Sequence, residues 1–180
     1  MARVVFFSFD YDDAWRVNQV RNSGRFIGEQ RSGFRDKAEY EQVKRTGDAA
    51  IKSWIRKQMH GCSVTCVLIG AATSRSRWVN FEIAESIANG MGLLGVYIHR
   101  LRVPQRQEQD EVLNMLFQPP SPPNPLDNHS MPPKDWFDQL SPAKASDRFE
   151  TYTWEPRESL FSWANDLGAW VDEAARRAGR

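Results

Sequence analysis

Short apolar runs alternate with helical patterns along this chain. Three runs are almost continuously hydrophobic, as strands buried on both faces are, and a weaker one follows near the end: 3–9, 63–69, 92–98 and 149–154. Apolar residues recur at the spacing of sheet-covering helices in four stretches: 14–20, 39–59, 77–89 and 158–176. This alternation predicts an α/β fold, a flavodoxin-like three-layer sandwich with a mostly parallel central sheet.

Two segments break the alternation. Residues 22–36 are rich in Gly, Arg and Ser, so we expect a loop there, with a weak second strand as the alternative. Residues 104–146 hold nine of the ten prolines and predict a surface insertion. We expect its Trp136 and Phe137 to pack on the domain; a lid or a partner-binding arm is the alternative.

The pattern predicts one domain over residues 1–180. Its parts are a core at 1–103, the proline-rich insertion at 104–148, and a final strand and helix at 149–180. With 180 residues, 41% of them hydrophobic, the chain is large enough to bury a core without disulfide or metal staples.

Charge and cysteine content narrow the classes of function. The net charge of +1 gives no reason to expect nucleic acid or an anionic membrane as a partner. The start resembles no signal peptide, and no run approaches the roughly 20 apolar residues of a membrane span, so we expect a cytoplasmic protein. Cys62 and Cys66 fit small core residues, and the three histidines are too scattered to predict a metal site.

The candidate chemistry begins in the helix predicted at 77–89. Trp78 and Glu82 share one helical face, while Val79 and Ile83 belong to another, so the carboxylate of Glu82 need not point into the core. A solvated surface charge is the plain alternative. Ligands of open α/β sheets bind beyond the carboxyl ends of the strands. The residues that follow the first strand and those that precede this helix therefore face one crevice.

These residues carry a family resemblance. Phe7-Ser8-Phe9 and the Ser-x-Trp-x-x-x-Glu sequence from Ser76 to Glu82 resemble two sequence boxes of the TIR domain superfamily. More narrowly, the stretches 5–11, 16–18 and 63–70 are similar to the TIR-like subunit of Thoeris antiphage systems. The resemblance covers about residues 3–100.

The resemblance implies cleavage of the nicotinamide–ribose bond of NAD, which is a substrate here and not a cofactor. Glu82 would be catalytic, and the substrate-binding residues would be Ser8, Phe9, Tyr11 and Trp78. Nicotinamide leaves as a neutral molecule, so one carboxylate that stabilises the ribosyl cation suffices without a general acid. We expect the backbone amides of residues 70–73, with Arg75 or Arg77, to receive the diphosphate.

The resemblance also implies partners: self-association, a phage-derived trigger, and an effector protein reached through a diffusible ADP-ribose-derived nucleotide. The residues leave hydrolysis and cyclisation both open. A non-catalytic interaction module of the same fold is an alternative function. A phosphoacceptor receiver, suggested by Asp10, Asp12 and Asp13, ranks last because the strand ending at Ile69 is followed by no acid.

Overall fold

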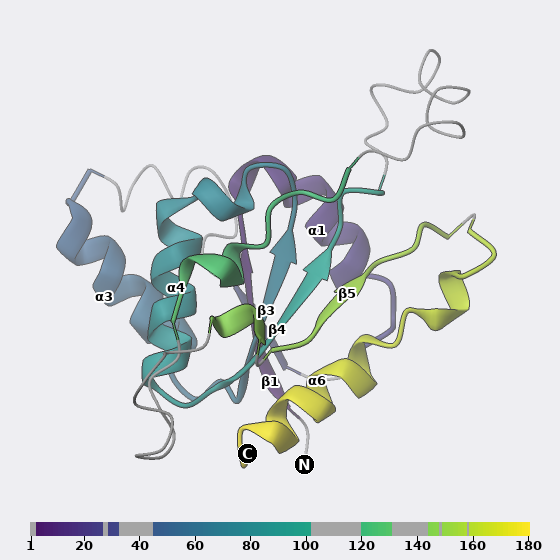
Figure 1. Ribbon diagram of the computed structural model, residues 1–180. Helices are drawn as coiled ribbons and strands as arrows, with labels where there is room; N and C mark the ends of the chain where they lie inside the picture. Colours follow the sequence, from purple (N-terminus) through teal and green to yellow (C-terminus); the bar gives the residue numbers. More distant parts are fainter. Residues whose placement is uncertain are drawn as a thin grey trace.

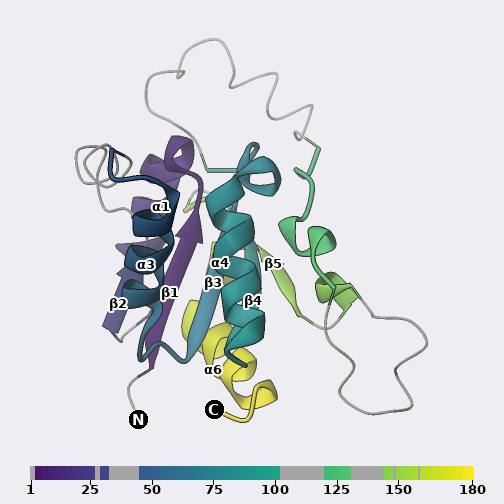
Figure 2. The same ribbon diagram turned by 90° about the vertical axis from the view of Figure 1, so that its left-hand side faces the viewer.

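The fold is built on a five-stranded sheet whose strands are all parallel. The computed structural model describes residues 3–26, 29–32, 45–101, 120–130, 144–147, 149–157 and 159–180. The strands are β1 (Val4–Phe9), β2 (Glu29–Ser32), β3 (Val64–Ile69), β4 (Gly92–Tyr97) and β5 (Thr151–Thr153). They lie in the order β2-β1-β3-β4-β5 (Figures 1 and 2). The predicted α/β class with a parallel sheet is confirmed.

Helices cover both faces of this sheet and complete the three layers (Figure 1). The helices are α1 (Ala14–Arg21), α3 (Asp48–Met59), α4 (Arg77–Ala88) and α6 (Leu167–Arg177). Because successive strand residues point to opposite faces, Val5 and Phe7 pack with α1 and α6, whereas Phe6 packs with α3. Val67 and Ile69 of β3 pack against Val79 and Ile83 of α4, the apolar helix face that the sequence predicts.

Helix α3 begins later than the sequence pattern indicates. The prediction places a helix over 39–59, interrupted on its inward face by Gly47; residues 39–44 lie outside the described part of the chain. Helix α3 begins at Asp48, directly after Gly47, whose φ of 92° is a conformation that favours glycine. Gly47 therefore marks the start of the helix and not a break within it.

The prediction of a final helix over 158–176 is wrong in its first half. Helix α6 begins at Leu167, where the side chain of Asp166 accepts a hydrogen bond from the backbone amide of Ala169. The segment before it is held by Asn165, whose side chain makes two hydrogen bonds to the backbone of Glu155. Leu160 and Trp163 were predicted on the core stripe, yet they are 88% and 73% exposed.

The two irregular segments are described only in part. Within 22–36, the weak strand that was the alternative to a loop exists as β2, paired with β1 at the sheet edge. From the proline-rich insertion, a short 3-10 helix at Pro125–Asn128 lies beside α4 (Figure 2). Its Leu126 is buried in the cluster formed by α4 and β3. Trp136 and Phe137, the predicted anchors, lie outside the described residues.

Candidate active site

The centre of the candidate site is a hydrogen bond between Ser8 and Glu82. Ser8 lies near the carboxyl end of β1, on the sheet face that α4 covers, and its Oγ donates to Oε2 of Glu82 at 2.6 Å. Glu82 is only 4% exposed and Ser8 is fully buried. The expectation that the carboxylate need not point into the core is therefore corrected, because the second turn of α4 lies directly over β1.

A second hydroxyl pair continues this polar contact along α4. Ser86 Oγ donates to the backbone carbonyl of Glu82 at 2.7 Å and lies 2.7 Å from Oγ1 of Thr65 on β3. We call Ser8, Glu82, Ser86 and Thr65 the polar ladder. All four residues are buried, and each side chain has a hydrogen-bond partner, which offsets the cost of removing polar groups from water.

Burial changes the protonation of Glu82. Loss of hydration raises the pKa of its carboxyl group from 4.5 to about 8, and the hydrogen bond from Ser8 opposes this rise only in part. At neutral pH the side chain in this conformation is therefore mainly the uncharged acid. A carboxyl group of this kind ionises when water or a cation reaches it, which makes its charge depend on access to the site.

The other residues predicted at the site lie in different places. Phe9 follows Ser8 on β1 and so packs on the opposite sheet face, against the cluster of α1 and α6. Tyr11 lies in the short 3-10 helix after β1 and is 44% exposed. Trp78 packs beside the α3 cluster, where its ring meets that of Phe81 edge to face. Among these predicted residues, Ser8 is the one that is hydrogen-bonded to the side chain of Glu82.

The turn between β3 and α4 is already engaged in internal hydrogen bonds. The amide of Gly70 donates to Thr73 Oγ1 at 2.8 Å, so one of the amides expected to receive a diphosphate is in use. Asn80 ties the turn to α4 by donating to the carbonyls of Ser74 and Ser76. Arg77 pairs with Asp48 of α3, and its guanidinium lies over the Trp78 ring.

A second group of polar residues at the carboxyl edge was missed by the sequence analysis. The carboxylate of Asp13 is buried directly on Gly70, where an added Cβ would lie 1.8 Å from Oδ2. Arg16 donates from Nη1 to Asp13 Oδ1 and from Nε to the Leu101 carbonyl, both at 2.8 Å. Asp10 caps the short 3-10 helix that precedes α1, where its side chain accepts a hydrogen bond from the amide of Asp12.

Remaining polar clusters point to no metal. Cys62 and Cys66 are buried thiols, as the sequence predicts for small core residues, and burial raises the pKa of the Cys66 thiol. Within the described ranges, no three acidic, cysteine or histidine side chains gather in a way that would hold a metal ion. In the same part of the chain, no helix has the length and apolar character needed to span a bilayer.

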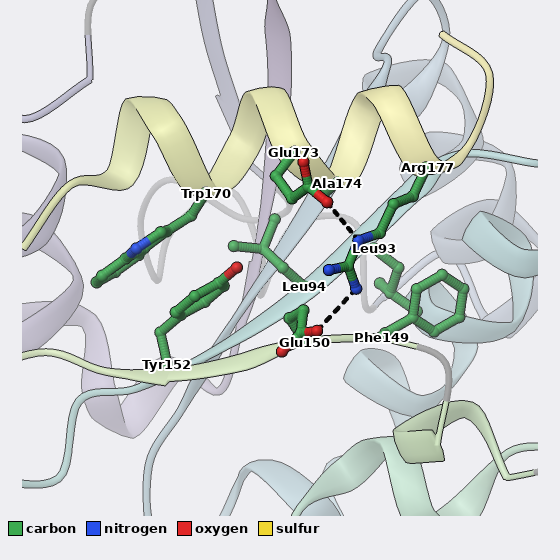
Figure 3. Close-up of a pocket in the computed structure, with 9 residues that line it drawn as sticks. All are labelled: Leu93, Leu94, Phe149, Glu150, Tyr152, Trp170, Glu173, Ala174 and Arg177. Atoms are coloured by element: carbon green, nitrogen blue, oxygen red, sulfur yellow. Dashed lines mark hydrogen bonds and ion pairs between the residues drawn. The ribbon is translucent and has the colours of Figure 1, made fainter.

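A shallow groove lies elsewhere, at the β5 edge of the sheet. Tyr152 and Trp170 stack with their ring centroids 4.3 Å apart, and Arg177 bridges Glu150 and Glu173 (Figure 3). The groove is lined by β4, β5 and α6 and includes no residue of the polar ladder. We therefore assign the candidate chemistry to Ser8 and Glu82 and not to this groove.

A known protein family matches the part of the chain that contains this site. The sequence model of the family described as "Thoeris protein ThsB, TIR-like domain" matches residues 6–103, which include both Ser8 and Glu82. A protein of Bacillus cereus (strain MSX-D12), named "Putative cyclic ADP-D-ribose synthase ThsB1", is 41% identical over 105 residues. That match covers 57% of this chain and 55% of the relative, so the chain spans about half of the relative's length. Because the family match takes in more than half of the chain, the protein belongs to the Thoeris ThsB TIR-like domain family.

Proposed function

We propose that this protein cleaves the nicotinamide–ribose bond of NAD and makes an ADP-ribose-derived signalling nucleotide, of cyclic form, in antiphage defence. The observation that supports the proposal best is the buried Ser8–Glu82 hydrogen bond between β1 and α4. It places a single carboxyl group beside the carboxyl end of a parallel strand, where open α/β sheets bind their ligands. The name of the Bacillus cereus relative agrees with this chemistry.

The proposed role of Glu82 is electrostatic. As the bond to nicotinamide breaks, positive charge develops on the ribose carbon, and an ionised carboxylate beside it lowers the barrier. Ser8 fixes one carboxylate oxygen through its 2.6 Å hydrogen bond. The neutral leaving group needs no proton, which fits a site centred on one acid. Tyr11 and Trp78 are proposed to contact the substrate. Phe9, which packs on the opposite face of the sheet, would reach the substrate only around the carboxyl end of β1.

The closed state of the pair provides a physical basis for regulation. Glu82 is 4% exposed and its pKa is raised to about 8, so the conformation described here presents an uncharged, covered acid. Substrate has to enter and the carboxyl has to ionise before the bond is cleaved. We propose that a phage-derived trigger or self-association favours the open form, and that the nucleotide product then activates a separate effector protein.

The test is NAD turnover by matched acid variants. Glu82→Gln keeps the shape and removes the charge, so we expect turnover to fall by about two decades or more while the fold is retained. Glu85→Gln is the matched control, because Glu85 lies one turn further along α4 and pairs with Arg56 away from Ser8. Mass spectrometry of NAD incubated with each protein, with and without lysate of phage-infected cells, measures both substrate loss and product.

Each outcome of this test has a defined meaning. Equal turnover by folded Glu82→Gln and wild-type protein would remove Glu82 from the mechanism. Loss of activity in both variants would indicate a structural defect of α4. Full turnover by dilute protein without lysate would refute the regulation while leaving the chemistry intact. A product mass equal to that of ADP-ribose would indicate hydrolysis, and one lower by a water molecule would indicate cyclisation.

A second candidate is a non-catalytic interaction module, and one surface favours it. Leu160, Phe161 and Trp163 are 88%, 63% and 73% exposed on the segment between β5 and α6. Large apolar side chains grouped on a surface commonly mark a protein contact. If this candidate is right, NAD stays intact under every condition, whereas Phe161→Ser with Trp163→Ser lowers the association measured by light scattering.

A further inference from the structure

His99 has an unusual environment just beyond the carboxyl end of β4. Its Nδ1 is buried and has no hydrogen-bond partner among the residues that the structure describes. Buried polar atoms in native proteins nearly always have a partner, so an exception requires an explanation. The ring itself is partly exposed and makes an edge-to-face contact with Tyr97, 5.8 Å between centroids. A ligand that displaced the groups covering this atom would complete its hydrogen bonding.

Arg16 lies beside His99 and is fixed in place. Two of its nitrogens are used, Nε by the Leu101 carbonyl and Nη1 by Asp13, while Nη2 has no partner among the described residues. The side chain is 27% exposed, so a ligand can reach part of it. A guanidinium held at two points loses little further freedom when it binds an anion, and its planar geometry suits phosphate oxygens.

We propose that Arg16 and His99 bind the diphosphate of the substrate, in place of the turn at residues 70–73. This assignment rests on the proposed function, since it names the contacts of the same dinucleotide. Gly70 already donates its amide hydrogen to Thr73, and Arg77 is paired with Asp48. The turn therefore has fewer donors and less positive charge available to bind an anion. Arg16 and His99 follow β1 and β4 at the carboxyl edge of the sheet, the edge at which open α/β sheets bind their ligands.

The charges around this site are compatible with an anion. Arg100 pairs with Glu155 and Arg16 with Asp13, and the pKa of Asp13 is raised by burial despite its guanidinium partner. Burial and the two neighbouring arginines lower the pKa of His99, so its imidazole is neutral at physiological pH. In the tautomer with hydrogen on Nδ1, the ring donates one hydrogen bond to a phosphate oxygen without adding a second buried charge.

The test compares three substitutions of His99 in binding of ADP-ribose, with adenosine as the probe that lacks the diphosphate. His99→Leu removes both nitrogens, His99→Asn keeps an amide near the position of Nδ1, and His99→Gln keeps one near Nε2. By isothermal titration calorimetry, we expect His99→Leu and His99→Gln to weaken ADP-ribose binding about tenfold or more. We expect His99→Asn to retain part of the wild-type affinity. Adenosine binding should be the same in all four proteins.

Arg16 is tested with a matched arginine. Arg3 also pairs with an aspartate and is also 27% exposed, but it precedes β1 at the opposite end of the strand. We expect Arg16→Gln to weaken ADP-ribose binding at least tenfold and Arg3→Gln to leave it unchanged. If Arg16→Gln unfolds because Asp13 loses its partner, the double variant Asp13→Asn with Arg16→Gln is used in its place. In this double variant both members of the ion pair are uncharged, so no buried charge is left without a partner.

The outcomes separate this inference from the proposed function. Wild-type affinity for ADP-ribose in the folded Leu and Arg16 variants would overturn the inference, and so would equal affinity of wild type for ADP-ribose and adenosine. Marked thermal destabilisation by His99→Leu with unchanged binding would show a structural role for His99 and would overturn it too. Absence of NAD cleavage together with diphosphate-dependent binding would refute the proposed enzyme and leave these contacts standing.

Discussion

The two faces of the sheet are built by the same strands, yet they differ in chemistry. Under α1 and α6, the strands present an apolar surface that includes Val5, Phe7 and Leu94. Under α4, the same strands present Ser8 and Thr65 to Glu82 and Ser86, within a frame of apolar residues. Burying polar groups brings little stability and burying apolar groups brings much. Apolar residues stabilise both faces, but the proposed chemistry belongs only to the face under α4.

The largest effect that this comparison predicts is on the apolar face. Leu94→Ala removes a fully buried side chain beneath α6, and we expect it to lower the free energy of unfolding by about 2–5 kcal/mol. Urea denaturation at pH 7 measures the loss. Turnover of NAD per folded molecule should change little, because Leu94 packs on the sheet face opposite to the polar ladder. A small change in stability would show that the core does not depend on this face.

The pH dependence of stability provides a second test, on the polar face. The folded protein raises the pKa of Glu82 from 4.5 to about 8, so between these values the folded state keeps a proton that the unfolded state has released. The stability contributed by this group is complete below pH 4.5 and is lost as the pH rises to about 8. Relative to Glu82→Gln, the free energy of unfolding of the wild-type protein should therefore fall by on the order of a few kcal/mol as the pH rises over that range.

Parallel denaturant titrations of both proteins at several pH values measure this difference, because every other titrating group cancels between them. A constant difference from pH 5 to pH 9 would mean that Glu82 is ionised inside the folded protein. Ser8→Ala sharpens the test. The hydrogen bond from Ser8 opposes the rise in the pKa of Glu82, so removing it should raise that pKa further. The pH-dependent loss of stability should then continue to higher pH than in the wild-type protein.

The smallest predicted effect concerns the hydroxyl pair of the polar ladder. Thr65→Val leaves the hydroxyl of Ser86 with only the Glu82 carbonyl, and Ser86→Ala leaves that of Thr65 buried without its partner. Each single change should cost about 1–2 kcal/mol, and the double variant less than the sum of the two. Additive losses would show that the two hydroxyls do not interact.

Much of the fold follows from the sequence because apolar periodicity reports burial directly. The strands, helix α4 and its Val79–Ile83 face lie where the pattern predicts them. The beginning of α6 does not, because Leu160 and Trp163 continue a helical spacing in a segment whose backbone is held by Asn165 and Asp166. The spacing of apolar side chains does not show the hydrogen bonds that stop a helix from extending.

The site is predictable only in part, for a related reason. Glu82 and Ser8 were found through sequence motifs, but their mutual contact depends on the register of α4 over β1, which no local pattern gives. Arg16 and His99 carry no spacing signal, since they come from a helix and a strand end that meet only in the folded sheet. The alternation of the pleat was the signal that would have placed Phe9 on the face opposite to Ser8.

The hydrogen bond between Ser8 and Glu82 joins residues 74 positions apart in the chain. Contacts of such long range form late in folding, because two parallel strands and the connections between them have to be ordered first. A chain emerging from the ribosome, or one trapped as a partly folded intermediate, thus lacks the paired acid altogether. Under the proposed function, NAD consumption is therefore confined to molecules that have finished folding.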